Sequence, residues 1–120
     1  ISKRLKNSIY LDKKLSNLNE YLQIPLRCKK NLETNALYMV LCKDRNKLMK
    51  FLSKNGIETK IHYPIPLHLQ KPAKELKLNN RNFPVSQYQA KHLLTLPVHQ
   101  YLTKKQLDYM INKIKYFYKK

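Results

Sequence analysis

Apolar residues in the first part of the chain recur at the spacing of one helical face. Lysines stand between them, and Pro25 ends the pattern. The sequence therefore predicts an amphipathic helix over residues 1–22, followed by a polar loop over residues 27–34. The apolar positions of this helix are Leu5, Leu11, Leu15, Leu18 and Leu22.

A short apolar run and a second amphipathic segment come next. Residues 36–42 are rich in strand-forming side chains and too few for a core helix, so they predict a buried strand. Asp44 is a typical N-cap residue. Asn55 followed by Gly56, the only glycine of the chain, can close a helix in the left-handed conformation. A helix is therefore predicted between them, with inner positions Leu48, Met49, Phe51 and Leu52.

The segment after this glycine has alternating apolar side chains, followed by two prolines. Residues 57–61 place apolar or β-branched side chains at every second position, which predicts a short, half-buried strand. Pro64 and Pro66 cannot donate ladder hydrogen bonds, and they favour extended conformations in the residues before them. We therefore expect the chain to leave the sheet here as a stiff, extended loop. The side chains that this loop presents are His62, Tyr63 and His68.

A less regular stretch separates this loop from the next helix. Residues 71–82 show no clear period and predict a loop with one helical turn at residues 73–76. Pro84 suits the first position of a helix. Residues 93–96 then read as a strand that Pro97 stops.

The last segment gives the clearest helical signal. Thr103 and Gln106, three residues later, can form a capping box, and apolar residues follow helical spacing to the end. Three predicted strands, at 36–42, 57–61 and 93–96, are separated by helices. This order indicates an α+β fold with a three-stranded sheet covered by helices. One domain spanning all 120 residues is expected.

Composition adds a strong positive charge. The formal net charge is +18, and it comes almost entirely from lysines scattered over every segment. Bidentate recognition of phosphate or guanine favours arginine, so a solvated basic surface is the favoured interpretation. A small basic module that binds nucleic acid or another polyanion remains the alternative.

The sequence also bears on location and completeness. No apolar run approaches the roughly 18 to 20 residues that cross a bilayer, and the first residues lack an apolar signal region. Cys28 and Cys42 lack metal-ligand spacing and fit a reducing compartment as buried or idle thiols. We therefore expect a cytoplasmic protein. The chain begins with Ile1 inside a helical pattern, which indicates a piece of a longer protein.

Short motifs along nearly the whole chain resemble one enzyme family. The most specific part is GIET at residues 56–59, followed by HYPIPLHLQ at residues 62–70. The strand at residues 38–42, FPV at residues 83–85 and LPV at residues 96–98 fall at the matching spacing. Together these motifs resemble the C-terminal domain of the DegT/DnrJ/StrS family of pyridoxal-phosphate-dependent aminotransferases, which act on nucleotide-linked keto-sugars.

The resemblance implies a fold-type I aminotransferase, with this chain as its small domain and a large cofactor-binding domain upstream. In such enzymes a lysine binds pyridoxal 5'-phosphate covalently, and glutamate is the usual amino donor. No lysine here matches that motif, so the chain alone is expected to be inactive. The complete enzyme is expected to be a homodimer that uses a nucleotide-diphosphate keto-sugar and glutamate.

The resemblance also assigns candidate substrate-binding residues. His62 and Tyr63 match family positions that reach into the active site of the partner subunit, near the sugar and diphosphate. Imidazole and phenol groups hydrogen-bond hydroxyls and phosphate oxygens well. His68 is a third candidate, matched by pattern without an assigned role. Without the resemblance, the favoured interpretation is a strand-end pair, in which His62 and Tyr63 only form hydrogen bonds with backbone groups.

Other histidine chemistry is disfavoured by the sequence. No Cys, Asp or Glu lies close enough to His62 and His68 to complete a tetrahedral metal site. His92 and His99 are expected at a helix end and in a loop, without a chemical role.

Overall fold

The computed structural model describes residues 1–28, 30–31, 33–77 and 82–119. Its α-helices are α1 (Ser2–Leu15), α2 (Arg45–Lys54), α3 (Lys71–Glu75), α4 (Pro84–His92) and α5 (Lys104–Tyr118). The short 3-10 helices are η1 (Ser16–Leu18) and η2 (Leu67–Leu69). The strands are β1 (Leu22–Gln23), β2 (Tyr38–Cys42) and β3 (Leu93–Leu96). The α+β class predicted from the sequence is therefore confirmed.

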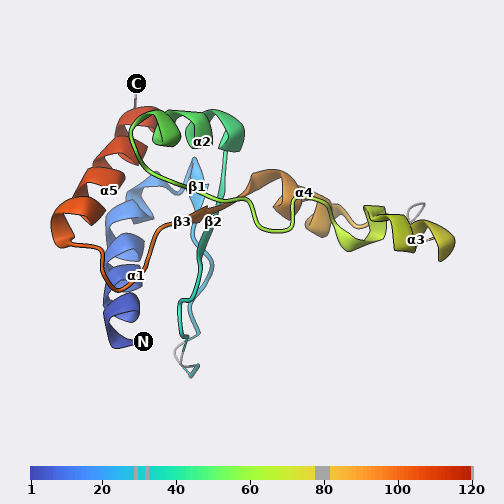
Figure 1. Ribbon diagram of the computed structural model, residues 1–120, viewed down its shortest axis with the longest axis horizontal. Coiled ribbons are helices and arrows are strands. Elements are labelled where there is room, and N and C mark those ends of the chain that lie inside the picture. The colour runs from blue at the N-terminus through green and yellow to red at the C-terminus, as the bar shows by residue number, and fades with distance from the viewer. Residues whose placement is uncertain (29, 32, 78–81, 120) are drawn as a thin grey trace.

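The three strands form one antiparallel sheet with β2 in the centre. β1 pairs Leu22 with Cys42, and β3 pairs Leu96 with Tyr38. Alternate side chains of β2 point to opposite faces of the sheet. One face carries Tyr38, Val40 and Cys42 into the core, against which α1, α2 and α5 pack (Figure 1). On the other face, Met39 and Leu41 are half-buried, and no described helix covers the centre of the sheet.

The final helix forms as its sequence predicts. The backbone N–H of Gln106 donates to Thr103 Oγ1 at 3.2 Å, and the N–H of Thr103 donates to Gln106 Oε1 at 2.9 Å, which confirms the capping box. The apolar stripe of α5 enters the core through Leu107, Met110, Ile111 and Ile114. Because these positions lie three or four residues apart, one face of the helix is buried against α1 and α2.

The first helix is shorter than the prediction of residues 1–22. It ends at Leu15, the chain makes the 3-10 turn η1, and Leu22 then enters β1. Ser and Asn residues after Leu15 favour turns over helix interiors, because their side chains compete for backbone hydrogen bonds. Leu18 and Leu22 are nevertheless buried as predicted. The leucine pattern therefore identified the buried positions but not the change in conformation.

The predicted strand at residues 57–61 is wrong, although its burial pattern holds. Ile57 is buried, Glu58 and Lys60 are exposed, and only a single bridge joins Lys60 to Thr95 of β3. A longer ladder would next pair Glu58 with Pro97, which has no N–H to donate. The third strand of the sheet is β1 instead.

Helix α2 confirms one predicted end and corrects the other. Gly56 has φ +74°, so the helix closes through a left-handed glycine as predicted. Asp44 occupies the N-cap position with φ +51°, but its side chain makes no capping hydrogen bond. Its carboxylate pairs instead with Lys47 Nζ at 2.7 Å.

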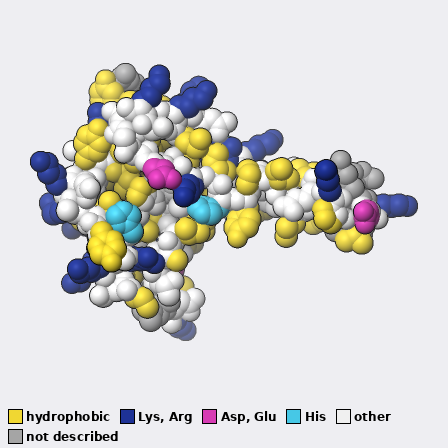
Figure 2. All heavy atoms as spheres, in the orientation of Figure 1, with side chains coloured by type: hydrophobic (Ala, Val, Ile, Leu, Met, Phe, Trp, Pro, Cys, Tyr) yellow, Lys and Arg dark blue, Asp and Glu magenta, His cyan; other side chains and the backbone are white. Residues whose placement is uncertain are grey.

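An arm that contains η2, α3 and α4 projects from the body formed by the sheet, α1, α2 and α5 (Figure 1). The helix predicted to begin at Pro84 is confirmed as α4, and the short helix α3 lies near the predicted helical turn. Residues 78–81 of the predicted loop lie outside the described residues. Hydrophobic side chains run along the arm in Figure 2, and lysines surround the body. Exposed large hydrophobic residues of the arm are Tyr63, Ile65, Leu67, Leu69, Leu76, Phe83, Val85 and Tyr88.

Two contacts fasten the arm to the body at the end of α4. Arg45 Nη1 donates to the carbonyl oxygen of Ala90 at 2.5 Å, and Cys42 Sγ donates to that of His92 at 3.5 Å. A cation at the C-terminus of a helix also interacts favourably with the helix dipole. The base of the arm is therefore held by β2 and α2.

Candidate functional site

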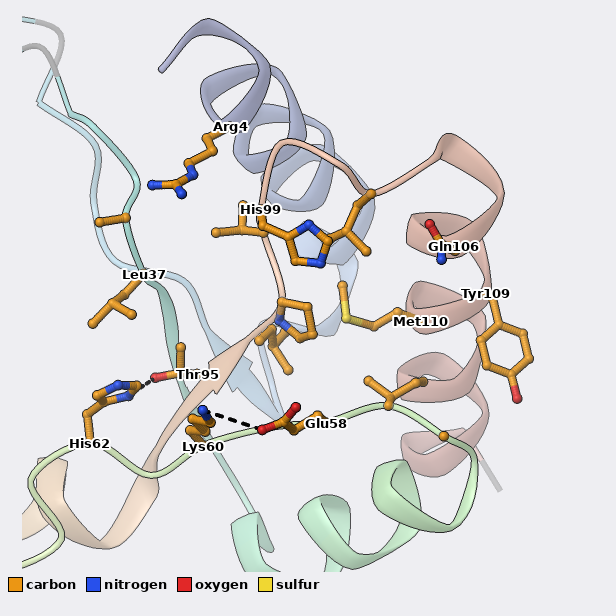
Figure 3. A pocket seen from close by; sticks show the side chains of 17 residues that line it. Arg4, Leu37, Glu58, Lys60, His62, Thr95, His99, Gln106, Tyr109 and Met110 are labelled. Carbon is orange, nitrogen blue, oxygen red and sulfur yellow. Dashed lines mark hydrogen bonds and ion pairs between the residues drawn. The ribbon is translucent and has the colours of Figure 1, made fainter.

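His62 stands where the chain leaves the sheet and the arm begins. Its Nδ1 lies 2.8 Å from Thr95 Oγ1, as the dashed line in Figure 3 shows. Thr95 is 8% exposed and exchanges two backbone hydrogen bonds with Lys60, of 2.8 and 3.2 Å. The imidazole of His62 is thus held through Nδ1 by a residue whose backbone is fixed in the sheet, and Nε2 remains for other partners.

Tyr63 follows in a strained backbone conformation. Its φ is +54°, a region that bulky L-residues seldom adopt, and its side chain is 81% exposed. The ring centroid lies 6.5 Å from that of His62, so the half-buried imidazole and the exposed phenol form one pair. Such strain is concentrated at functional sites, where the surrounding structure maintains it.

His62 lines two open grooves. The first, the Lys60 groove, has a volume of about 530 Å³ and is drawn in Figure 3. The second, the sheet groove, has a volume of about 740 Å³ and includes Tyr63. The residues with polar side chains that line the Lys60 groove are Arg4, Glu58, Lys60, His62, Thr95, His99, Gln106 and Tyr109.

The two grooves differ in chemistry. In the Lys60 groove, Arg4 comes from α1 and Gln106 from α5, while Lys60 Nζ pairs with Glu58 at 3.4 Å at the exposed surface. Donors therefore dominate this groove. The sheet groove is mostly apolar, because it is floored by the uncovered side of the sheet and walled by the arm. Its apolar residues include Met39, Leu41, Ile65, Leu67 and Leu93.

The loop that carries His62 and Tyr63 is held at several points. Gln70 Nε2 donates to the carbonyl oxygen of Ile65 at 3.1 Å, and the N–H of Leu69 donates to that of Pro66 at 2.9 Å. Together with the fixed φ of the prolines, these bonds reduce the conformational freedom that a bound ligand would have to remove.

His68 occupies a different environment from His62 and Tyr63. It is 6% exposed, its Nε2 lies 3.2 Å from Gln87 Nε2, and its ring lies 4.7 Å from that of Phe83. It lines a third cavity, between η2 and α4, and neither groove that His62 lines. The structure therefore places His68 as a contact between the loop and α4, and its predicted role in substrate binding stays a prediction.

Several residues that line the Lys60 groove were not identified from the sequence, among them Thr95 and His99. Thr95 is one of several β-branched residues in apolar runs, and nothing in the local pattern marks its contact with His62. His99 was expected to have no chemical role, yet it lines the Lys60 groove. Only the fold brings the loop after β3 beside residues 57–62. His92 lies at the end of α4 as expected.

The two thiols differ in burial, and none of the described lysines is buried. Cys28 is exposed and Cys42 is buried, and both are free. Burial raises the pKa of the Cys42 thiol to about 11. Every lysine whose side chain the structure describes is exposed or half-buried, so none sits in an enclosed cavity.

Within the described part of the chain, no three His, Cys, Asp or Glu side chains come together as a metal site would require. No helix in that part of the chain has the length and apolar character needed to cross a membrane.

Comparisons with known proteins give two curated relatives that match most of the chain. The chain is 34% identical over 79 residues to the erythromycin biosynthesis sensory transduction protein EryC1 of Saccharopolyspora erythraea, a match that covers 66% of this chain and 22% of EryC1. It is 25% identical over 96 residues to dTDP-3-amino-3,6-dideoxy-alpha-D-galactopyranose transaminase of Aneurinibacillus thermoaerophilus, covering 80% of this chain and 26% of the transaminase.

A solved structure extends the likeness to nearly the whole fold. The crystal structure of a DegT DnrJ EryC1 StrS aminotransferase from Brucella abortus superposes with a TM-score of 0.84 at 26% identity, covering 99% of this chain and 31% of that one. The chain thus spans about a fifth to a third of the length of these relatives. A model of the family matches residues 1–115. The chain therefore belongs to the DegT/DnrJ/EryC1/StrS aminotransferase family.

Proposed function

We propose that this chain is the C-terminal, small domain of a pyridoxal-phosphate-dependent enzyme that aminates a nucleotide-linked keto-sugar with glutamate as amino donor. The family supports transamination, and one relative is named a transaminase of a dTDP-linked amino sugar. The observation that carries the proposal is the His62–Tyr63 pair, presented on a held loop beside two open grooves.

His62 and Tyr63 contact the substrate in this proposal. Nε2 of His62 and the hydroxyl of Tyr63 are groups that hydrogen-bond sugar hydroxyls and phosphate oxygens. Arg4, Lys60 and His99 line the Lys60 groove together with His62, and basic side chains there suit the negative charge of a diphosphate. The domain also closes the cleft in which the sugar binds.

The cofactor belongs elsewhere in the full-length enzyme. Pyridoxal 5'-phosphate, when bound, supplies an electron sink for the exchange of an amino group. A lysine that reacts with a carbonyl is activated by a desolvated or cationic pocket, and no lysine described here is enclosed. The described residues therefore do not fit the cofactor, and we assign it to the part of the enzyme outside this chain. This chain alone would then be inactive.

The proposal includes a homodimer in the cytoplasm. Dimer formation would cover the exposed apolar side chains of the arm and carry Tyr63 toward a second subunit. The loop around Pro64 and Pro66 carries no Asp, Glu, Lys or Arg between residues 61 and 70, so repulsion between two strongly basic copies is smallest there. Two free thiols suit the reducing cytoplasm.

The test uses the full-length protein. Purified enzyme should absorb in the near-visible range of bound pyridoxal phosphate, and glutamate should bleach that band. Addition of a nucleotide-linked keto-sugar should restore it. A protein that binds no pyridoxal phosphate, or whose band glutamate leaves unchanged, would refute the proposed reaction.

A further inference from the structure

The contact between His62 and Thr95 determines more than the position of a ring. A neutral imidazole carries its proton on one nitrogen, and the hydrogen bond made by that ring decides which nitrogen it is. Thr95 Oγ1 lies 2.8 Å from Nδ1, so the direction of this hydrogen bond sets the character of Nε2. Nε2 is a donor if Nδ1 accepts, and an acceptor if Nδ1 donates.

The surroundings of Thr95 favour one direction. Among the described residues, His62 is the only side chain with which the hydroxyl of Thr95 makes a hydrogen bond. Thr95 is 8% exposed, and a buried hydroxyl without an acceptor costs about 1–3 kcal/mol. Donation to Nδ1 gives the hydroxyl proton an acceptor, whereas the reverse direction leaves that proton without an acceptor among the described residues. The satisfied arrangement places the imidazole proton on Nε2.

Thr95 is also well suited to hold an orientation. Its backbone is paired with Met39 of β2 on one side and with Lys60 on the other. A β-branched side chain has few χ1 states open to it in such a position. His62 lies only two residues after Lys60, so the sheet fixes both ends of the contact. The strained residue, Tyr63, follows directly.

We propose that Thr95 is a positioning residue for His62, which holds the imidazole as the Nε2–H tautomer and presents that N–H as a donor to the grooves. The group it would meet is an oxygen acceptor, a sugar hydroxyl or phosphate oxygen; this identity rests on the proposed function, whereas the tautomer does not. The same geometry restricts His62 to donating rather than accepting when it is neutral.

Nitrogen NMR of the full-length protein labelled with 15N-histidine tests the tautomer directly. Spectra are recorded at pH 8.5, above the usual titration range of histidine, and His62 is assigned by its absence in His62→Asn. The expected result is one protonated Nε2 and one unprotonated Nδ1. A proton on Nδ1 in the unmodified protein would overturn the proposal without any variant.

Two variants separate positioning from a general structural role. Thr95→Val keeps the side-chain shape and removes the hydroxyl, and Thr95→Ser keeps the hydroxyl. We expect mixed tautomers in Thr95→Val and the parent spectrum in Thr95→Ser. The KM for the nucleotide sugar should rise roughly fivefold in Thr95→Val, as for the loss of one net hydrogen bond, with a smaller change in kcat and recovery in Thr95→Ser.

The outcomes distinguish this inference from the proposed function. An unchanged tautomer in a folded Thr95→Val protein would overturn the positioning role. A changed tautomer with an unchanged KM would support the positioning role and refute the contact of His62 with substrate. Because the NMR measurement uses neither substrate nor amino donor, it stands whether or not the enzyme transaminates.

Discussion

The hydroxyl of Tyr38 offers a sharp test of how the core is held together. The residue is 0% exposed, and its hydroxyl donates to Asp12 Oδ1 at 2.6 Å. Arg27 binds the same carboxylate, with Nε 3.1 Å from Oδ2, and lies over the Tyr38 ring at 5.4 Å from its centroid. Burial, reinforced by the Asp12 carboxylate, raises the pKa of Tyr38 well above its usual value. The hydroxyl therefore stays a donor at physiological pH.

We expect Tyr38→Phe to lower the free energy of unfolding by about 1.5–3 kcal/mol, because a hydrogen bond to a charged group contributes that much. For 120 residues this corresponds to a fall in Tm of about 6–12 °C, from an unfolding entropy of about 2.1 cal/mol/K per residue. This loss of stability includes no contribution from a cavity, because Tyr38→Phe keeps the ring. Urea unfolding followed by circular dichroism measures the change.

Tyr10→Phe is the matched control. Tyr10 also donates from its hydroxyl to an aspartate, Asp108, but this pair lies at the surface between α1 and α5. Lys14 and Lys104 flank the Tyr10 ring, and solvent screens the site. The loss of stability should be clearly smaller than for Tyr38→Phe. Equal losses in the two variants, or a Tyr38→Phe protein as stable as its parent, would refute the reasoning.

Three further predictions concern the thiols and the single glycine. The folded thiol of Cys42 has its pKa raised from 9.0 to about 11, so between these values the unfolded chain loses a proton that the folded chain keeps. The contribution of this thiol to stability should be full below pH 9 and fall by up to about 1.4 kcal/mol per pH unit above it. Urea unfolding of Cys42→Ala should show a shallower fall between pH 9 and 10 than the parent, although Tyr38, whose pKa is also raised, adds to the fall in both proteins; equal slopes in the two proteins would contradict this. A thiol reagent such as dithionitrobenzoate should modify Cys28 quickly and Cys42 only after unfolding, since one is exposed and the other buried; two fast-reacting thiols in the native protein would contradict this. Gly56→Ala should cost about 1 kcal/mol, measured by the same unfolding assay, because φ is +74° while an added Cβ meets no atom within 4 Å; an unchanged stability would mean that the helix closes differently.

Features that depend on a few neighbouring residues were predicted correctly from the sequence. The capping box of Thr103 and Gln106, the left-handed Gly56 and the first-turn Pro84 each depend on neighbouring residues, and all three form as expected. The leucines at 18 and 22 were correctly predicted as buried. The strand conformation of Leu22 was not predicted, because β1 exists only through pairing with β2, which follows later in the chain.

Long-range contacts explain what the sequence did not predict at the site. The segment at residues 57–61 has the alternation of a strand, but Pro97 stands where its partner would donate. The contact of His62 with Thr95 and the placement of His99 in the Lys60 groove join segments separated by more than 30 residues. His68 shares the motif of His62 and Tyr63, yet it packs on Phe83 of the arm. Sequence proximity alone could not separate these roles.

Measurement of the two half-reactions of the full-length enzyme tests most directly whether the His62–Tyr63 pair contacts the sugar substrate through Tyr63. Glutamate bleaching of the cofactor band reports the first half-reaction, and its recovery with nucleotide-linked keto-sugar reports the second. Tyr63→Phe is compared with Tyr101→Phe, because the two tyrosines are 81% and 79% exposed and Tyr101 lines neither groove. The prediction is that Tyr63→Phe raises the keto-sugar concentration for half-maximal recovery roughly fivefold, leaves glutamate bleaching unchanged, and differs in this from Tyr101→Phe. Equal behaviour of the two variants, or an effect of Tyr63→Phe on the glutamate step alone, would contradict a substrate contact at this site.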